Sequence, residues 1–166
     1  MAELQRLRAD HAPAVLEFEV ANRAWFARSI SDRGDDYFEQ FTERLDALLT
    51  DQAAGAAAFY VLVDEDGSVL GRFNLELVGN GVATLGYRVA ERAAGRGVAT
   101  ATVRELCGVA ASRHGVSTVR AATSRENVAS QRVLLKAGFT EAGPADPSDI
   151  GGAQGSWYQL DVATTR

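Results

Sequence analysis

Hydrophobic positions in the first third of the chain repeat with helical spacing. After a short strand over residues 4–7, Asp10 is suited to cap a helix that carries apolar residues on one face and is interrupted near Asn22. A second helical repeat begins at Asp35-Asp36 and ends before Gly55. This part of the chain is therefore predicted to be helical after its first strand.

The pattern changes to alternation beyond residue 57. Residues 58–63 are rich in strand-forming types, a turn follows over 64–67, and residues 69–78 place hydrophobic and polar side chains in turn. A second glycine-containing turn over 79–81 leads into another strand pattern over 82–89. Three consecutive antiparallel strands are predicted.

The C-terminal half alternates helices and strands. We expect helices over 97–112 and 127–137, strands over 116–123, 139–142 and 156–162, and a long loop over 143–155. This mixture of helices and strands predicts the fold class α/β (α+β). Because there is no internal repeat, we expect a single domain spanning residues 1–166.

Composition narrows the function classes. The chain has 166 residues, a hydrophobic share of 46%, a formal charge of −5 and Lys136 as its one lysine, so non-specific nucleic-acid binding is disfavoured and a cationic substrate mildly favoured. No signal region or membrane span is evident, and Cys107 has no partner for an internal disulfide. These features predict a soluble, cytoplasmic protein.

A glycine-rich turn at Gly95 and Gly97 stands between the third strand of this run and the next helix. Such a turn allows backbone N–H groups to converge at a helix N-terminus, which suits a pyrophosphate. A dinucleotide site also needs a third glycine, where Thr100 stands, and an acidic residue after the next strand; a Walker loop needs G-K-S/T. Both nucleotide interpretations are disfavoured.

Two motifs together resemble the GCN5-related N-acetyltransferase (GNAT) superfamily. Residues 94–99, AGRGVA, are similar to its coenzyme A motif Q/R-x-x-G-x-G/A but have Ala94 at the first position, and residues 127–139, NVASQRVLLKAGF, are similar to its N-x-x-S signature. Leu85-Gly86-Tyr87 before the turn resembles the RimJ/RimL branch, which acetylates ribosomal-protein N-termini. The resemblance implies a mixed, mostly antiparallel sheet of about six or seven strands, splayed at its centre, with about four helices on its two faces.

The resemblance also implies which residues hold acetyl-CoA. Backbone groups of the strand before the turn would pair with the pantetheine arm, the turn and helix start would hold the pyrophosphate, and Asn127 would reach the pantetheine amides, although asparagine is also a favoured N-cap. The implied acetyl-CoA contacts are Tyr87, Arg88, Val89, Ala94, Gly95, Arg96, Gly97, Val98, Ala99, Thr100, Asn127 and Ser130.

Catalytic roles follow from the same resemblance. The Val89 N–H would polarise the thioester carbonyl, and Ser130 would protonate the departing thiolate, because Leu134 stands where many members carry a tyrosine acid. The resemblance leaves the general base undecided between two candidates, Asp149 and Glu76. Two carboxylates of the first helix, Glu17 and Glu19, are candidates for binding the amine.

The implied activity is acetyl-CoA-dependent transfer to a primary amine by direct attack in a ternary complex. The acceptor is a protein N-terminus or a small amine, and a catalytically inactive coenzyme A-binding sensor is the alternative from another class. A homodimer is implied by the resemblance, without nucleic acid or membrane as partner. The histidines and the cysteine form no metal-binding pattern, and four aromatic residues are candidates to line the acceptor cleft: Trp25, Phe26, Trp157 and Tyr158.

Overall fold

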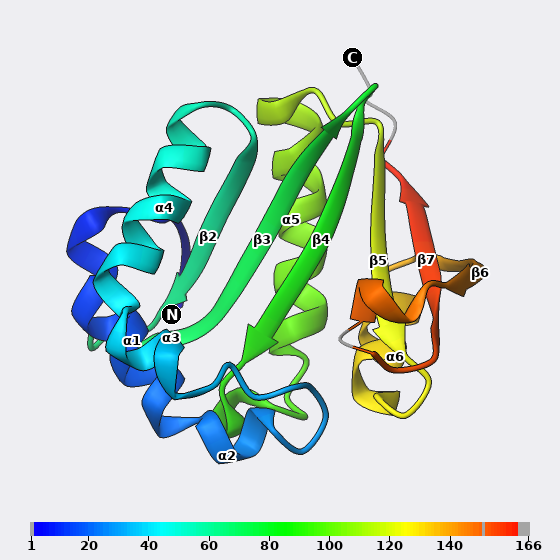
Figure 1. Cartoon of the computed structure of the whole chain (residues 1–166). Coiled ribbons are helices and arrows are strands. Elements are labelled where there is room, and N and C mark those ends of the chain that lie inside the picture. Colours follow the sequence, from blue (N-terminus) through cyan, green and yellow to red (C-terminus); the bar gives the residue numbers. More distant parts are fainter. Residues whose placement is uncertain (1, 151, 163–166) are drawn as a thin grey trace. The chain divides into compact units, whose positions relative to one another are not determined.

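The computed structural model describes residues 2–150 and 152–162. The chain divides into two compact units, Met1–Asn74 with Tyr87–Ala94, and Leu75–Gly86 with Gly95–Arg166. Seven strands form one open mixed sheet in the order β1-β2-β3-β4-β5-β7-β6 (Figure 1). The α/β class and the expected number of strands are confirmed.

The strands fall close to the predicted segments. Their bounds are β1 Glu3–Arg6, β2 Ala57–Val63, β3 Val69–Gly79, β4 Val82–Val89, β5 Thr118–Ser124, β6 Thr140–Ala145 and β7 Gly155–Asp161. The prediction for the sixth strand ended too early, at residue 142. The strand continues because an irregularity between Glu141 and Gly143 lets it resume pairing with β7 at Trp157.

Six α-helices and three 3₁₀ segments lie in the described part of the chain. The helices are α1 Ala12–Ala21, α2 Arg23–Phe26, α3 Asp35–Glu39, α4 Phe41–Ala53, α5 Val98–His114 and α6 Val128–Lys136; the 3₁₀ segments are η1 Ala9–His11, η2 Glu91–Ala93 and η3 Pro147–Ile150. None of these helices is long and apolar enough to cross a membrane.

The six helices arise because both helical segments of the first third are divided: the interruption near Asn22 was predicted, and the one at Gln40 was not. At Asn22 the side-chain Nδ2 donates to the Phe18 carbonyl at 2.9 Å, so the side chain competes with the backbone and ends α1. At Gln40 the backbone leaves helical geometry (φ −105°, ψ 22°) and separates α3 from α4. The predicted cap at Asp10 is also wrong, since Asp10 lies within η1 and His11 is the N-cap of α1.

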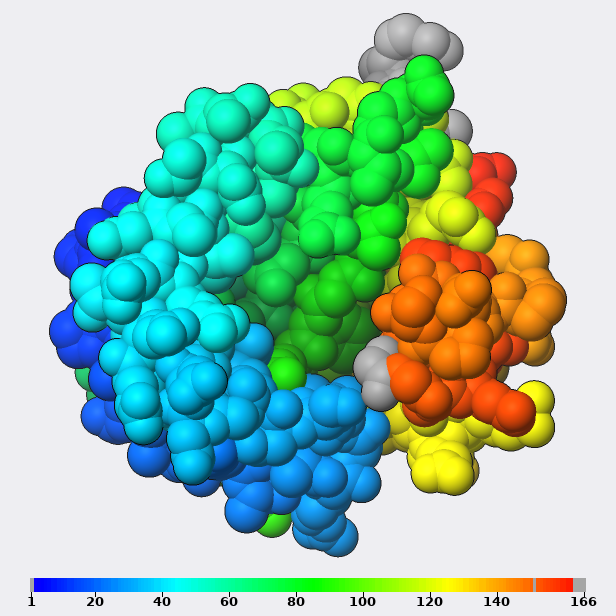
Figure 2. Space-filling model, in the orientation of Figure 1, coloured from blue at the N-terminus to red at the C-terminus, as the bar shows by residue number. Residues whose placement is uncertain are grey.

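The first unit has a continuous hydrophobic core. β1 pairs antiparallel with β2, with Glu3 opposite Val63, and the core joins β2 and Leu7, the residue after β1, to α1, α3 and α4. Its fully or nearly fully buried members include Val15, Phe18 and Val61. Figure 2 shows the blue-to-cyan helices of this unit packed against one another at the surface.

The second unit is organised around β5. β4 pairs in parallel with β5 over Val82–Thr84, opposite Thr118–Arg120. On its other side, β5 pairs antiparallel with β7 along its whole length. Within this unit, the last residues of β5 are paired by β7, and the β4–β5 ladder covers only Val82–Thr84 of β4.

Candidate functional site

The glycine turn has the backbone geometry of an anion site. Gly95 and Gly97 have φ values of +72° and +79°, a region that favours glycine, and α5 begins directly afterwards without a side-chain cap at Gly97. The N–H of Ala101 donates to the Gly97 carbonyl at 3.0 Å. The preceding N–H groups at the start of a helix have no carbonyl within that helix, so they are suited to a phosphate ligand.

The end of β4 is held by α2. The indole Nε1 of Trp25 donates to the Val89 carbonyl at 3.2 Å, and the Ala90 N–H donates to the Leu70 carbonyl at 2.8 Å. The sequence placed Trp25 in the acceptor cleft; in the structure its hydrogen bond orients the peptide group that follows Val89. Phe26, also proposed for the cleft, is a core residue with 5% exposure.

The start of α6 brings Asn127 and Ser130 together. Asn127 is the N-cap, and its Oδ1 accepts a hydrogen bond from the Ser130 N–H at 3.1 Å. The cap therefore uses the amide oxygen, and a contact with a pantetheine carbonyl would come from the Asn127 NH₂ group. The Ser130 side chain is on the first turn and partly buried.

Gln131 was missed by sequence reasoning. Its Nε2 donates to the carbonyls of Ser124 and Arg125 at 2.9 and 2.8 Å, which fixes the turn between β5 and α6. A glutamine one residue after a catalytic candidate carries no recognisable pattern, so only the structure reveals this clamp. Leu134, at the position of the family's tyrosine acid, is 0% exposed and belongs to the core.

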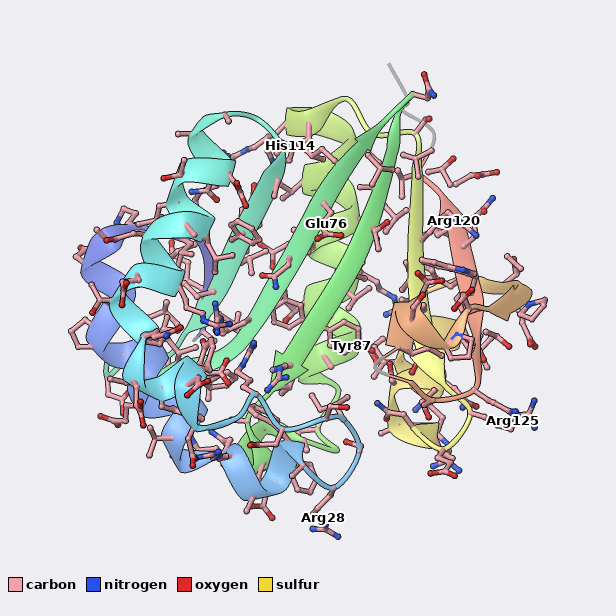
Figure 3. All side chains as sticks on the ribbon, viewed as in Figure 1. Arg28, Glu76, Tyr87, His114, Arg120 and Arg125 are labelled. Carbon is pink, nitrogen blue, oxygen red and sulfur yellow. The ribbon has the colours of Figure 1, made fainter. Side chains whose placement is uncertain are left out.

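The candidate bases are both on the surface. Glu76 lies on β3 with an exposed side chain (Figure 3), and Asp149 is exposed within η3, where its N–H donates to the Asp146 carbonyl at 2.8 Å. Glu17 is also exposed, on α1. The structure places these carboxylates but gives none of them a contact that marks it as a base.

Glu19 is the exception among the candidate carboxylates. It is 1% exposed, and its oxygens accept hydrogen bonds from Arg72 at 2.7 Å, from Arg33 at 2.9 and 3.2 Å, and from Arg88 at 3.4 Å. We call these four residues the Glu19 cluster. Burial raises the pKa of the Glu19 carboxyl, but the hydrogen bonds and charges of Arg33 and Arg72 together hold it below its usual value.

The remaining candidates have structural environments. Cys107 is buried, and burial raises the pKa of its thiol to about 12. His11 accepts from the Arg8 N–H at 2.9 Å and lies 3.0 Å from Gln5 Oε1. Over residues 2–150 and 152–162, no group of three or more histidine, cysteine or acidic side chains is arranged to hold a metal ion.

The two C-terminal aromatic residues differ from each other. The Arg120 guanidinium carbon on β5 lies 4.3 Å from the centroid of the Trp157 ring on β7, so the two side chains form a cation–π contact. Tyr158 is 6% exposed and belongs to the core, and burial raises the pKa of its hydroxyl.

Comparison with known proteins identifies the family. Residues 2–140 match the family described as "Acetyltransferase (GNAT) domain". The chain therefore belongs to the GNAT acetyltransferase family, as its two motifs predicted. A comparison with curated proteins gave no match.

Solved structures agree on the fold. Ribosomal-protein-S5-alanine acetyltransferase from Vibrio fischeri is 20% identical with a TM-score of 0.87, covering 96% of this chain and 92% of that chain. RimJ from Mycobacterium smegmatis, in complex with CoA-disulfide, is 22% identical with a TM-score of 0.84, covering 96% and 81%. Microcin C7 self-immunity acetyltransferase MccE, in complex with acetyl-CoA and AMP, is 15% identical with a TM-score of 0.81, covering 96% and 92%. The RimJ/RimL-like architecture inferred from the sequence is thus found among its structural neighbours.

Proposed function

We propose that this protein transfers the acetyl group of acetyl-CoA to a primary amine, with a protein N-terminus as the acceptor class that its RimJ-like neighbours favour. The glycine turn opening α5 carries this proposal. Its two positive-φ glycines and uncapped helix start provide the donors that a pyrophosphate needs, inside a chain of the GNAT family. Acetyl-CoA supplies an activated acyl group as its thioester.

Donor binding is assigned to backbone groups. Residues 94–100 bind the pyrophosphate through N–H groups and the positive end of the α5 dipole, with Arg96 adding charge. Tyr87, Arg88 and Val89 pair with the pantetheine arm through their main chain. The support for this assignment is the sequence motif that precedes and includes the glycine turn.

The catalytic assignments are one backbone hydrogen-bond donor, one general acid and two candidate bases. The Val89 N–H donates to the thioester oxygen, and the Trp25 bond to the Val89 carbonyl holds the following peptide group. Ser130 Oγ delivers the proton to the departing sulfur. Asp149 and Glu76 remain the two candidate bases. Because both are exposed, either carboxylate can pass the proton that it takes from the amine on to water.

A thiol-release assay with acetyl-CoA and a panel of N-terminal peptides and small amines tests the function. We expect turnover of at least one amine. Ser130→Ala should lower kcat about 100-fold, which is at the low end of the effect of a general acid, because a thiolate is a good leaving group even without protonation. Ser112→Ala, on the exposed end of α5, is the matched control and should be unaffected. Binding of acetyl-CoA without turnover of any acceptor would instead favour a coenzyme A sensor.

The scope of the proposal is one N-acetyltransferase domain over residues 1–166; residues 1, 151 and 163–166 lie outside the described structure. A cytoplasmic location is part of the proposal, supported by a single cysteine that has no internal partner. The homodimer stays a prediction, which measurement of the solution mass checks.

A further inference from the structure

The Glu19 cluster contains more positive charge than its own carboxylate can balance. Arg33, Arg72 and Arg88 converge on one glutamate, so the cluster has a formal charge of +2 inside a chain whose total is −5. Like charges placed together in a partly buried site are unfavourable unless an anion compensates them. The cluster is therefore electrostatically prepared for a further anion.

Arg88 is the least satisfied of the three arginines. Glu19 Oε2 already accepts from Arg72 at 2.7 Å, and Glu19 Oε1 from Arg33 at 2.9 Å, whereas Arg88 reaches Oε1 only at 3.4 Å. Charge-assisted bonds are normally about 2.7–2.9 Å long. Burial, followed by the neighbouring charge of Arg33, lowers the pKa of Arg88 to about 10. These observations agree that Arg88 lacks a full counter-ion.

The two weaker members of the cluster are accessible. The side chains of Arg88 and Arg33 are 17% and 26% exposed, while that of Arg72 is 6% exposed and committed to Glu19 and the Tyr37 hydroxyl. Arg88 also lies over the Phe26 ring at 5.0 Å, which limits the directions in which the guanidinium can move. An oxyanion can therefore meet a pre-oriented fork from the solvent side.

The position of Arg88 relates this site to acyl transfer. Its neighbour in β4 is Val89, the residue assigned to polarise the thioester, and consecutive α-carbons are only about 3.8 Å apart. The helix α2 touches both residues: Trp25 donates to the Val89 carbonyl, and Phe26 packs under Arg88. An anion held by Arg88 would thus be bound close to the end of the strand that presents the thioester contact.

We propose that Arg88, assisted by Arg33, binds a carboxylate carried by the acceptor, so that the preferred acceptor is an amine with an acidic group near its reacting nitrogen. This inference rests on the proposed acetyltransferase function and specifies its substrate class. It concerns the Arg88 side chain, and the Arg88 backbone keeps its assigned role toward pantetheine. Bidentate pairing with a carboxylate explains why an arginine, and not a lysine, stands here.

Turnover with matched acceptors tests the substrate class. The probes are tripeptide amides with aspartate at the second or third position, each with its asparagine twin, and free amino acids with their amides. We expect kcat/KM to be about tenfold or more higher for the acidic member, in line with one charge-assisted bond. Arg88→Gln should remove most of this preference and Arg88→Lys should restore part of it. Arg8→Gln, a surface control, should keep the preference.

A binding measurement separates this proposal from the function on which it rests. Succinate, compared with sodium chloride and phosphate at equal ionic strength, should raise the Tm of the wild type and not that of Arg88→Gln. No turnover of any amine, with the succinate effect intact, would refute the acetyltransferase function but support the anion site. Equal rates for acidic and neutral acceptors, or a succinate effect unchanged in Arg88→Gln, would overturn the anion site. Phosphate can also bind at the glycine turn, so only the part of each Tm shift that Arg88→Gln removes reports on Arg88; a larger Arg88-dependent shift with phosphate than with succinate would overturn the choice of carboxylate.

Discussion

Replacing Glu19 by glutamine should destabilise the protein strongly. The substitution keeps the shape of the side chain and one acceptor oxygen, but it removes the carboxylate that Arg72 contacts at 2.7 Å, and the Arg72 side chain is only 6% exposed. Removing one partner of a buried ion pair typically costs about 3–5 kcal/mol. Because one acceptor oxygen remains, we expect the lower end, about 3 kcal/mol, and a Tm lower by about 6–12 °C for a chain of this size.

Urea unfolding followed by circular dichroism measures this change. Glu17→Gln is a matched control on the same helix, and it should change the free energy of unfolding by no more than about 0.5 kcal/mol because Glu17 is exposed. If Glu19→Gln is as stable as Glu17→Gln, the Glu19 cluster does not stabilise the fold and the reasoning is refuted.

The same residue makes stability depend on pH. The pKa of Glu19 is lowered in the folded state, so below about pH 4.3 the unfolded chain binds the proton more readily. The contribution of Glu19 is therefore complete above that pH and is lost as the pH falls through the folded-state pKa. Glu19→Gln should show a shallower loss of stability over this acid range, measured by unfolding at a series of pH values.

Three further experiments test other features. Trp25→Phe removes the indole donor to the last carbonyl of β4. It should lower kcat about five- to tenfold with little change in KM, because one hydrogen bond contributes about 1 kcal/mol. Gly155→Ala should cost about 1–3 kcal/mol because its Cβ would collide with the Thr123 carbonyl, whereas Gly108→Ala, in open space on α5, should stabilise by up to about 1 kcal/mol; thermal unfolding compares them. Cys107 should react with a thiol reagent only after unfolding, and rapid labelling of the native protein would contradict its burial.

The sequence predicted the strands and the glycine turn well because their signals are local. Alternation over 69–78 and two glycines before a helical repeat need no distant partner to be recognised. The interruption near Asn22 was predicted, whereas the break at Gln40 was missed because the apolar repeat continues across it. Only the side-chain bond from Asn22 to the Phe18 carbonyl shows why α1 ends there.

The site was predictable to the extent that it depends on motifs. The capping of α6 by Asn127 follows from a short pattern, whereas the Glu19 cluster joins residues that are far apart in sequence. Arg72 lies on the polar side of the alternating pattern of its strand, yet it is buried. Its burial depends on pairing with α1, which no local pattern encodes.

The confinement of three arginines to the Glu19 cluster has a consequence for how acceptors arrive. The whole chain has 17 basic and 22 acidic residues, so the part outside the cluster has 14 and 21, a formal balance of −7. A field of this sign acts over about one Debye length, repels polyanions and accelerates the approach of a protonated amine at low salt. Long-range attraction thus favours the ammonium end of an acceptor, and short-range recognition by Arg88 favours its carboxylate. A zwitterion satisfies both.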